Sequence, residues 1–490
     1  MPFLSTTALA KLNCDVLIIG SGPGGSISAY HLAAQGYDTM LVEEGPDTRE
    51  AILTPYSSEE MNQRYRNGAL TPFLGGTGYT YAEGRCLGGG SQVNSGFFHP
   101  PVPEILAGWS ESNHIRSLSA KELEPHVAEI ARELSIASVG DAYEGSSAQK
   151  LKIGADRLGW LSREVPRWIS SIPQPDGSWQ TTRMGMAESY LPKASASGAR
   201  ILTGVRIDRL TLKNGRAVEA HGHYMNGYVA VKPVSILFRE VIVCAGAIHT
   251  PHLLRRSGIK ANIGNSLQSH PMLRVIARFP DEVNEGNFGV PVRQVLEFMP
   301  DFTFGSSVST IPHLSLWMDK GLAKPGIPLI EDSRYLSVYY ALTSSVTRGR
   351  IRSLPLFAEP TVHLPLGLGD YERLAEGTVK LGRVLFEAGC TELYLPVPDC
   401  PVIRSYQQLQ RLQAWIAQAR PEASTIHLFG SCPLGEDPNR FPLDSFGKVQ
   451  ALDNIYVNDA SMLPGCTGVN PQATLMTLAQ RNILNFIHNK

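Results

Sequence analysis

The sequence predicts an α/β fold in which a parallel sheet with a βαβ unit is joined to an α+β part built on an antiparallel sheet. Two observations near the start predict the first part. A short β-branched run at 16–19 precedes a cluster of glycines, and a helical pattern then leads to a second apolar run at 39–42. One observation predicts the second part. Apolar and polar residues alternate repeatedly between 270 and 425, as in strands with one wet face.

The glycines after the first run have the spacing G-x-G-x-x-G, at Gly20, Gly22 and Gly25. Gly20 permits a tight turn, Gly22 lets a pyrophosphate approach the backbone, and Gly25 lets the helix pack close to the strand. The second run ends in Glu43, about 20 residues further on, where a ribose hydroxyl needs an acceptor. This order predicts a Rossmann-like dinucleotide site. The alternative is a glycine turn in an α/β protein that binds no nucleotide.

A second glycine-rich stretch covers residues 84–96, with three consecutive glycines followed by Ser91 and then Asn94. Backbone without side chains can lie flat against a ligand, and the two polar residues add contacts. A flexible linker is the alternative, but the apolar residues within and beside the stretch argue against it. We therefore expect a second ligand-binding loop here.

Composition excludes several classes of function. A chain of 490 residues is long enough for two or more domains. Its net charge is −1 and it has no basic stripe, so we expect no nucleic-acid partner. No apolar stretch is long enough for a membrane span, and the start has no secretory pattern. The seven scattered cysteines lack C-x-x-C spacing, which predicts reduced thiols, a cytoplasmic location and no metal site.

The C-terminal part carries two residues whose side chains could take part in a reaction. His427 lies in an apolar segment, and Asn470 stands before Pro471, just ahead of a helical pattern. The free N–H groups of that helix would point at whatever lies beside Asn470. Taken alone, His427 is more readily a packed histidine. For Asn470 the alternative is a turn residue before proline.

Four separated blocks of sequence decide between a structural and a chemical role for His427 and Asn470. They are residues 20–25 with Glu43, residues 84–94, residues 240–254 and residues 427–474. In these blocks, and in their order, the chain resembles the glucose–methanol–choline (GMC) family of FAD oxidoreductases, most of all its cholesterol oxidase branch. The resemblance implies oxidation of an alcohol CH–OH group to an aldehyde or ketone, by hydride transfer to flavin N5. It also implies an FAD-binding domain and a substrate domain.

The resemblance also assigns roles to residues. His427 would be the base or hydrogen-bond partner of the hydroxyl, and Asn470 would position the alcohol oxygen. An unperturbed imidazole, with a pKa near about 6.5, suits that task. Covalent family members carry histidine just before the asparagine of the glycine-rich block, where this chain has Val93, so we expect non-covalent FAD. The FAD-binding residues would be Gly20, Gly22, Gly25, Glu43, Gly88, Gly89, Ser91, Asn94, Val205, Asp459, Ala460, Asn470, Pro471 and Gln472.

The predicted boundaries are discontinuous. The FAD-binding domain would comprise residues 1–160, 190–268 and 425–490, and the substrate-binding domain residues 161–189 and 269–424. Aromatic and polar residues in the second domain suit a sugar, an amino sugar of aminoglycoside type or another polyol as well as a sterol, and the lack of an evident long apolar lid favours the polar class. A sterol-type alcohol and a flavin-containing lyase stay open as alternatives, as does the choice of O₂ or another electron acceptor. Further candidates at the site are His99, His313 and His363, and a carboxylate at Glu297 or Glu331.

Overall fold

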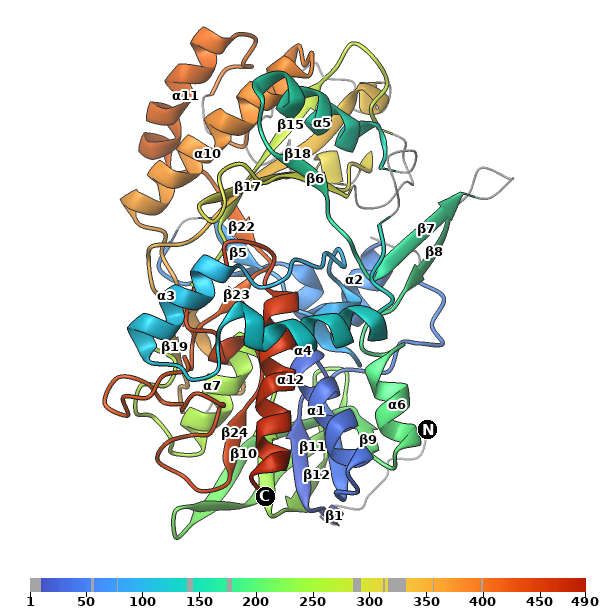
Figure 1. Ribbon diagram of the computed structural model, residues 1–490, viewed down its shortest axis with the longest axis vertical. Coiled ribbons are helices and arrows are strands. Elements are labelled where there is room, and N and C mark those ends of the chain that lie inside the picture. Colours follow the sequence, from blue (N-terminus) through green and yellow to red (C-terminus); the bar gives the residue numbers. More distant parts are fainter. Residues whose placement is uncertain are drawn as a thin grey trace.

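The computed structural model describes residues 10–53, 57–76, 78–138, 144–173, 179–284, 292–311, 313–315, 332–355, 357–397 and 400–490. Two parts are stacked along the long axis (Figure 1). The lower part contains a parallel sheet and the first and last helices, and the upper part contains a large, mainly antiparallel sheet under a helical layer. The predicted fold class is confirmed.

The parallel sheet places the start of the chain at its centre. Its strands, in spatial order, are β24 (Ile455–Val457), β13 (Glu240–Val243), β2 (Val16–Ile19), β3 (Thr39–Glu43) and β9 (Arg200–Thr203). All residues of β2 and β3 are buried, because helices cover the faces of a parallel sheet. Helix α1 (Pro23–Ala34) connects these two strands, as predicted, and packs against the C-terminal helix α12 (Gln472–His488).

Glycines let α1 approach its neighbours closely. A Cβ atom on Gly25 would lie 1.9 Å from the carbonyl oxygen of Gly20, and one on Gly24 would lie 1.6 Å from that of Asn458. Gly20 itself has a φ of +103°, in the region that favours glycine. The tight turn and the close packing expected from the glycine spacing are therefore present.

A four-stranded sheet extends from this part, in the order β1 (Ala10–Asn13), β12 (Val229–Leu237), β11 (Arg216–Asn226) and β10 (Val205–Lys213). Asn214 and Gly215 connect β10 to β11 with φ values of 49° and 75°. Two consecutive positive φ values are those of the type I′ hairpin turn. Val205, the first residue of β10, begins this sheet directly after the turn that follows β9.

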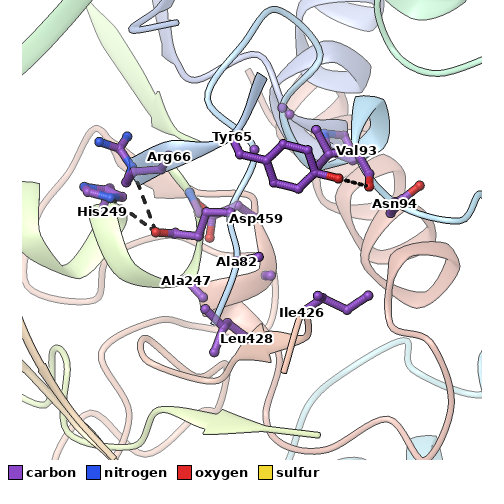
Figure 2. A pocket seen from close by; sticks show the side chains of 18 of the residues that line it. Tyr65, Arg66, Ala82, Val93, Asn94, Ala247, His249, Ile426, Leu428 and Asp459 are labelled. Atoms are coloured by element: carbon purple, nitrogen blue, oxygen red, sulfur yellow. Dashed lines mark hydrogen bonds and ion pairs between the residues drawn. The ribbon is translucent and has the colours of Figure 1, made fainter. Parts of the chain in front are cut away.

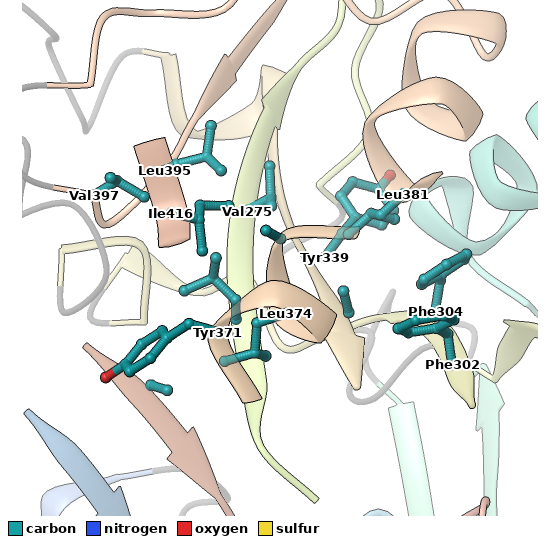
Figure 3. Packing of buried hydrophobic residues seen from close by; sticks show 14 of the residues in the cluster. Val275, Phe302, Phe304, Tyr339, Tyr371, Leu374, Leu381, Leu395, Val397 and Ile416 are labelled. Carbon is teal, nitrogen blue, oxygen red and sulfur yellow. The ribbon is translucent and has the colours of Figure 1, made fainter. Parts of the chain in front are cut away.

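The large sheet forms the floor of the upper part. Its order is β4 (Thr71–Pro72), β5 (Tyr79–Tyr81), β22 (Ala423–Thr425), β15 (Met272–Arg278), β18 (Leu336–Thr343), β17 (Phe302–Ser306), β16 (Arg293–Val295) and β6 (Ser162–Glu164), with β21 (Glu392–Tyr394) also paired to β15. Helices α5 (Ser146–Leu158), α10 (Leu368–Glu387) and α11 (Tyr406–Ala419) cover its outer face. Figure 3 shows the packing, with Leu374 and Leu381 beside Val275 and Tyr339.

The remaining elements lie around and between these sheets. They are α2 (Ser58–Arg64), η1 (Arg66–Ala69), η2 (Gly89–Gln92), α3 (Pro103–Asn113), α4 (Ala120–Glu133), β7 (Ile169–Pro173), β8 (Trp179–Arg183), α6 (Tyr190–Ala196), α7 (Gly246–Arg256), β14 (Gln268–Ser269), η4 (Ser333–Tyr335), β19 (Arg350–Arg352), β20 (Thr361–His363), β23 (Leu428–Phe429) and η5 (Ala460–Met462). Ser119 and Glu122 form a capping box on α4, as the sequence predicts.

The structure departs from the predicted boundaries in three places. Helix α5 and strands β4 and β5, expected in the FAD-binding domain, belong to the upper part, since Leu151 and Ala155 join its core. Trp168 and Met186, expected in the substrate domain, pack in the core of α1. The amino-acid composition of these segments does not show which part they join, because both cores use the same types of apolar residue. Within the region 270–425, where alternation predicts strands, residues 313–315 are helical.

No helix among the described residues is long and apolar enough to cross a membrane. They contain no group of three or more His, Cys, Asp or Glu side chains placed to hold a metal ion. All seven cysteines fall within the described ranges and are free, and six are buried.

Candidate active site

One cavity of about 460 Å³ lies between the two parts of the molecule. At one end it is lined by the turn after β2, by the end of β3 and by the second glycine-rich stretch. At the other end it reaches β15, β17 and β18 of the large sheet. Ligands of open α/β sheets bind at the carboxyl ends of the strands, which is where this cavity begins.

The glycine-lined end forms a cradle. Gly22 and Gly90 both line the cavity, and a Cβ on either would meet nothing within 4 Å, so a side chain there would project into open space. The two segments touch, because a Cβ on Gly89 would lie 2.9 Å from the Cα of Gly22. No side chain caps the N-terminus of α1, which leaves its N–H groups for an anion. These features fit the pyrophosphate of a dinucleotide.

Glu43 lies beside this cradle and is held on both oxygens. Oε2 accepts from the N–H of Ser21 at 3.0 Å and from its hydroxyl at 2.7 Å, and Oε1 accepts from the N–H of Gly45 at 2.8 Å. An ionised carboxylate has about four acceptor sites, so Glu43 keeps capacity for a ribose hydroxyl. Val205 lines the same end of the cavity.

Asp459 lines the middle of the cavity and joins two strand ends. Its carboxylate accepts from the N–H of Gly246 at 2.8 Å, from the hydroxyl of Thr250 at 2.5 Å, and from the N–H of Ser461 at 2.8 Å. Burial raises the pKa of Asp459 above its usual value, and the donors oppose that rise. The carboxylate therefore fixes β13 and β24 relative to one another at the cavity wall.

The remaining predicted cofactor residues divide into two groups. Ala460, Pro471 and Gln472 line the cavity with Asn94, whose side-chain amide donates to that of Gln472. Gly25, Gly88 and Ser91 do not line it. Gly25 lies in the first turn of α1, packed against Gly20. The fully buried hydroxyl of Ser91 donates to the carbonyl of Gly88 and accepts from the N–H of Met186. Ser91 therefore stabilises the loop from the side that faces away from the cavity.

His427 and Asn470 meet on the cavity wall, at the end nearer the large sheet. Nε2 of His427 lies 3.3 Å from Nδ2 of Asn470. On the other side of the ring, Nδ1 of His427 lies 3.2 Å from Nδ1 of His270. His427 is also fixed through its backbone, because its N–H donates to the hydroxyl of Thr425 at 3.1 Å. The structure thus brings the two predicted catalytic residues together.

The pKa of His427 differs from the value assumed from the sequence. Burial, with a smaller effect of nearby His99, lowers it to about 3, because an imidazolium loses its hydration in this site. Burial also lowers the pKa of His270 well below its usual value, and His427 lowers it further. Both rings are therefore neutral at ordinary pH.

A charged cluster lines the cavity between its two ends and was not predicted. Nε of Arg66 and Nε2 of His249 lie 3.9 and 3.6 Å from Oε2 of Glu83. Dashed lines in Figure 2 start from the labelled Arg66 and His249. Arg66 also pairs with Glu44 at 2.8 Å and helps to hold the pKa of that carboxyl below its usual range. His249 lies in α7, Arg66 begins η1, and the two glutamates follow β3 and β5. These segments are separate in the chain, so no single sequence pattern joins the four residues.

The end of the cavity at the large sheet carries polar side chains beside the apolar Met272, Val308 and Leu342. Arg274, Ser306 and Tyr340 line it together with His313. The buried hydroxyl of Ser306 has no hydrogen-bond partner among the described residues. Of the other sequence candidates, His363 and Glu297 do not line the cavity. Glu297 instead accepts from the N–H of Leu161, His99 lies beside Gln294, and Glu331 is outside the described residues.

Sequence comparison identifies proteins related to this chain. Two family models described as GMC oxidoreductase match residues 61–272 and 347–479, and a model described as FAD binding domain matches residues 13–56. The "Uncharacterized GMC-type oxidoreductase y4nJ" of Sinorhizobium fredii is 32% identical over 483 residues, which cover 96% of this chain and 94% of that protein. The chain belongs to the GMC oxidoreductase family. It is an oxidoreductase, and its cofactor is FAD.

Other relatives of this GMC oxidoreductase are more distant. Long-chain-alcohol oxidase FAO3 of Arabidopsis thaliana is 26% identical, over 96% of this chain and 67% of its own. The 6'''-hydroxyparomomycin C oxidase of Streptomyces lividus is 24% identical, over 95% and 90%. The crystal structure of pyridoxine 4-oxidase from "Mesorbium loti" superposes with a TM-score of 0.75 at 20% identity, over 97% of this chain and 99% of that one. The superposition supports the fold of this GMC oxidoreductase.

Proposed function

We propose that this protein uses non-covalently bound FAD to oxidise the CH–OH group of a polar alcohol to an aldehyde or ketone. The observation that carries the proposal is the contact between His427 and Asn470 on the wall of a cavity that begins at the glycine cradle. FAD, when bound, accepts a hydride at N5. The protein's own residues must then hold the alcohol and receive the proton of its hydroxyl.

The predicted FAD-binding residues keep their assignment as a proposal, with the cavity-lining ones in direct contact. Non-covalent binding is supported by Val93, which lies on the cavity wall where a linking histidine would be needed. The carbonyl of Val93 accepts from the hydroxyl of Tyr65 at 2.9 Å (Figure 2). An aliphatic side chain offers no nucleophile for a bond to the flavin.

His427 is proposed as the group that takes the proton. A neutral imidazole can accept it at Nε2, the nitrogen nearer Asn470. Because burial makes the protonated ring costly, proton transfer should accompany oxidation of the carbon rather than precede it. The side-chain amide of Asn470 can donate to the alcohol oxygen and fix its position.

A polar substrate fits the far end of the cavity best. An alkyl chain there would lie against the polar side chains of Arg274 and Tyr340 and would leave the hydroxyl of Ser306, which has no hydrogen-bond partner among the described residues, unsatisfied. Burying an unsatisfied polar group costs free energy. A sugar, an amino sugar or another polyol can hydrogen-bond to them. The hydroxyparomomycin named for the Streptomyces relative is compatible with this class, whereas the long-chain alcohols named for the Arabidopsis relative favour the sterol-like alternative.

The test is a panel of alcohols added anaerobically to the purified holoprotein. We expect flavin bands near roughly 370 and 450 nm, bleached by polyols or amino sugars. Bleaching by sterols or long-chain alcohols alone would contradict the substrate class, and a flavin that no alcohol bleaches would contradict the oxidation itself. Product formed without bleaching would favour a lyase. Recovery of colour in air would identify O₂ as an acceptor, and no recovery would indicate another one.

Two further predictions accompany this function. The free, mostly buried thiols support a reducing compartment, and we infer a cytoplasmic location. The relationship to the cholesterol oxidase branch stays an expectation from the sequence.

A further inference from the structure

A row of residues crosses the large sheet toward the catalytic pair. Gln294 on β16 is in register with Gly305 on β17, Gly305 with Tyr340 on β18, and Tyr340 with Arg274 on β15. Residues in register across neighbouring strands point to the same face. Tyr340 and Arg274 line the cavity, but Gln294 is fully buried and does not. Gln294 therefore stands behind the cavity wall.

Gly305 makes room for the side chain that holds Gln294. A Cβ at Gly305 would lie 2.3 Å from the hydroxyl oxygen of Tyr340, so the tyrosine passes over β17 at this glycine. Nε2 of Gln294 donates to that hydroxyl oxygen at 2.6 Å. The same nitrogen donates to Oδ1 of Asn470 at 3.3 Å. Both N–H groups of Gln294 are therefore used, one by the anchor and one by Asn470.

The direction of these bonds continues to His427. With Oδ1 of Asn470 turned to Gln294, its Nδ2 is the atom 3.3 Å from Nε2 of His427. Nδ2 can only donate, so Nε2 must be the unprotonated nitrogen and Nδ1 must carry the proton. Rotating the Gln294 amide by half a turn would reverse every bond and place the proton on Nε2. His427 could then not accept a proton from an alcohol.

His99 favours the first direction. The side chain of His99 lies beside that of Gln294. Nε2 of His99 and Oε1 of Gln294 are both buried and have no hydrogen-bond partner of normal geometry among the described residues. An N–H of His99 directed at Oε1 keeps the nitrogen of Gln294 turned toward Tyr340 and Asn470. Such a bond would anchor the oxygen end of the Gln294 amide, in addition to the bond that Tyr340 makes with its nitrogen.

We propose that Gln294, held by Tyr340 across Gly305, is a positioning residue that sets the amide direction of Asn470 and through it the tautomer of His427. The proposal rests on the proposed role of His427 as the proton acceptor. It assigns a function to a residue that touches neither the cavity nor the reacting atoms.

Two substitutions of Gln294 separate this role from simple packing. Gln294→Met keeps the volume and removes both donors, so the limiting rate of anaerobic flavin reduction should fall about tenfold or more, with the Kd of the alcohol changed less than about threefold. Gln294→Glu can donate to Asn470 only when its carboxyl is protonated. Its rate should therefore fall as pH rises through the pKa of that carboxyl. Tyr340, His99 and the register neighbour Arg163 are the titratable groups around it.

Tyr339→Phe is the control for losing a buried hydrogen bond elsewhere in the large sheet. It removes a hydroxyl that donates to the carbonyl of Ser147 on the opposite face of the sheet, and it should leave the rate unchanged. A wild-type rate in Gln294→Met, or a wild-type pH profile in Gln294→Glu, would overturn the proposal.

A second measurement does not depend on any substrate. In holoprotein labelled with ¹⁵N-histidine, the signals lost in His427→Gln identify His427, and their shifts report which nitrogen carries the proton. We expect an unprotonated Nε2 in the native chain and a protonated Nε2 in ionised Gln294→Glu. The same tautomer in both proteins would overturn the proposal. If no alcohol reduces the flavin, the proposed function fails, but this tautomer test still decides on Gln294.

Discussion

The Nδ1 atoms of His270 and His427 lie 3.2 Å apart, with the two rings nearly perpendicular at 87°. Two neutral imidazoles in this arrangement share one proton between these nitrogens, so one ring must donate and the other must accept. His270 is fully buried and lies behind His427, away from the cavity lining. Each ring therefore constrains the tautomer of the other.

Substitution of His270 should separate hydrogen bonding from volume. Asparagine can place an amide oxygen near the position of Nδ1 and still accept the proton, so His270→Asn should keep the rate of flavin reduction within about fivefold. His270→Leu leaves Nδ1–H of His427 without an acceptor and should slow reduction by about tenfold or more. Stopped-flow reduction of the holoproteins measures both rates. Equal rates in the two variants would show that His270 contributes packing only.

His427 itself has a larger expected effect. His427→Gln keeps a polar side chain but removes the proton acceptor, so alcohol-driven flavin reduction should fall by about 10²-fold or more. The FAD content should stay at the native level, because the glycine cradle is untouched. His488→Gln, at an exposed position in the last turn of α12, is the control for the substitution. Unchanged reduction in His427→Gln would remove this residue from the mechanism.

Alanine substitutions at two glycines of the cradle region should affect folding and FAD binding differently. Gly22→Ala adds a methyl group that meets no protein atom within 4 Å, so the chain should fold while losing FAD affinity by tenfold or more, on the order of 1–2 kcal/mol. Gly25→Ala collides with the carbonyl of Gly20 and should impair folding. Gly108→Ala, in α3 with open space around it, should change neither. FAD retained per chain and thermal unfolding distinguish the three.

Acid should destabilise the protein through its buried histidines. Burial lowers the pKa of His99 and His252 to about 4 and that of His427 to about 3. In the unfolded chain these rings titrate near about 6.5, so below that pH the unfolded state binds more protons and the free energy of unfolding falls. Each ring contributes at most about 1.4 kcal/mol per pH unit, between pH 6.5 and 4.

Urea unfolding of the holoprotein at several pH values from 7.5 to 5 tests this expectation. His427→Gln should show a shallower fall, since one titrating ring is gone. The raised pKa of Asp459 acts in the opposite direction. A stability that does not change between pH 7 and 5 would contradict the buried, neutral state of these rings.

Local patterns explain what could be predicted. The order of strand, glycines, helix and acid at Gly20–Glu43 depends on residues close in the chain, and so do the Asn214–Gly215 turn and the capping box at Ser119. The pairing of His427 with Asn470 came from a resemblance to a family, since nothing in either segment alone indicates that they touch. The domain boundaries were misplaced around α5 because its apolar stripe does not say which core it joins.

By itself, the sequence determined the nucleotide-binding βαβ unit and the residue types at the reacting end, because backbone geometry and side-chain chemistry are local properties. Only the tertiary structure decided how those side chains behave. It placed Gln294 and His270 behind Asn470 and His427, and it lowered the pKa of His427 to about 3. Desolvation and hydrogen-bond direction both depend on which distant segments enclose a group, and a linear pattern does not contain that information.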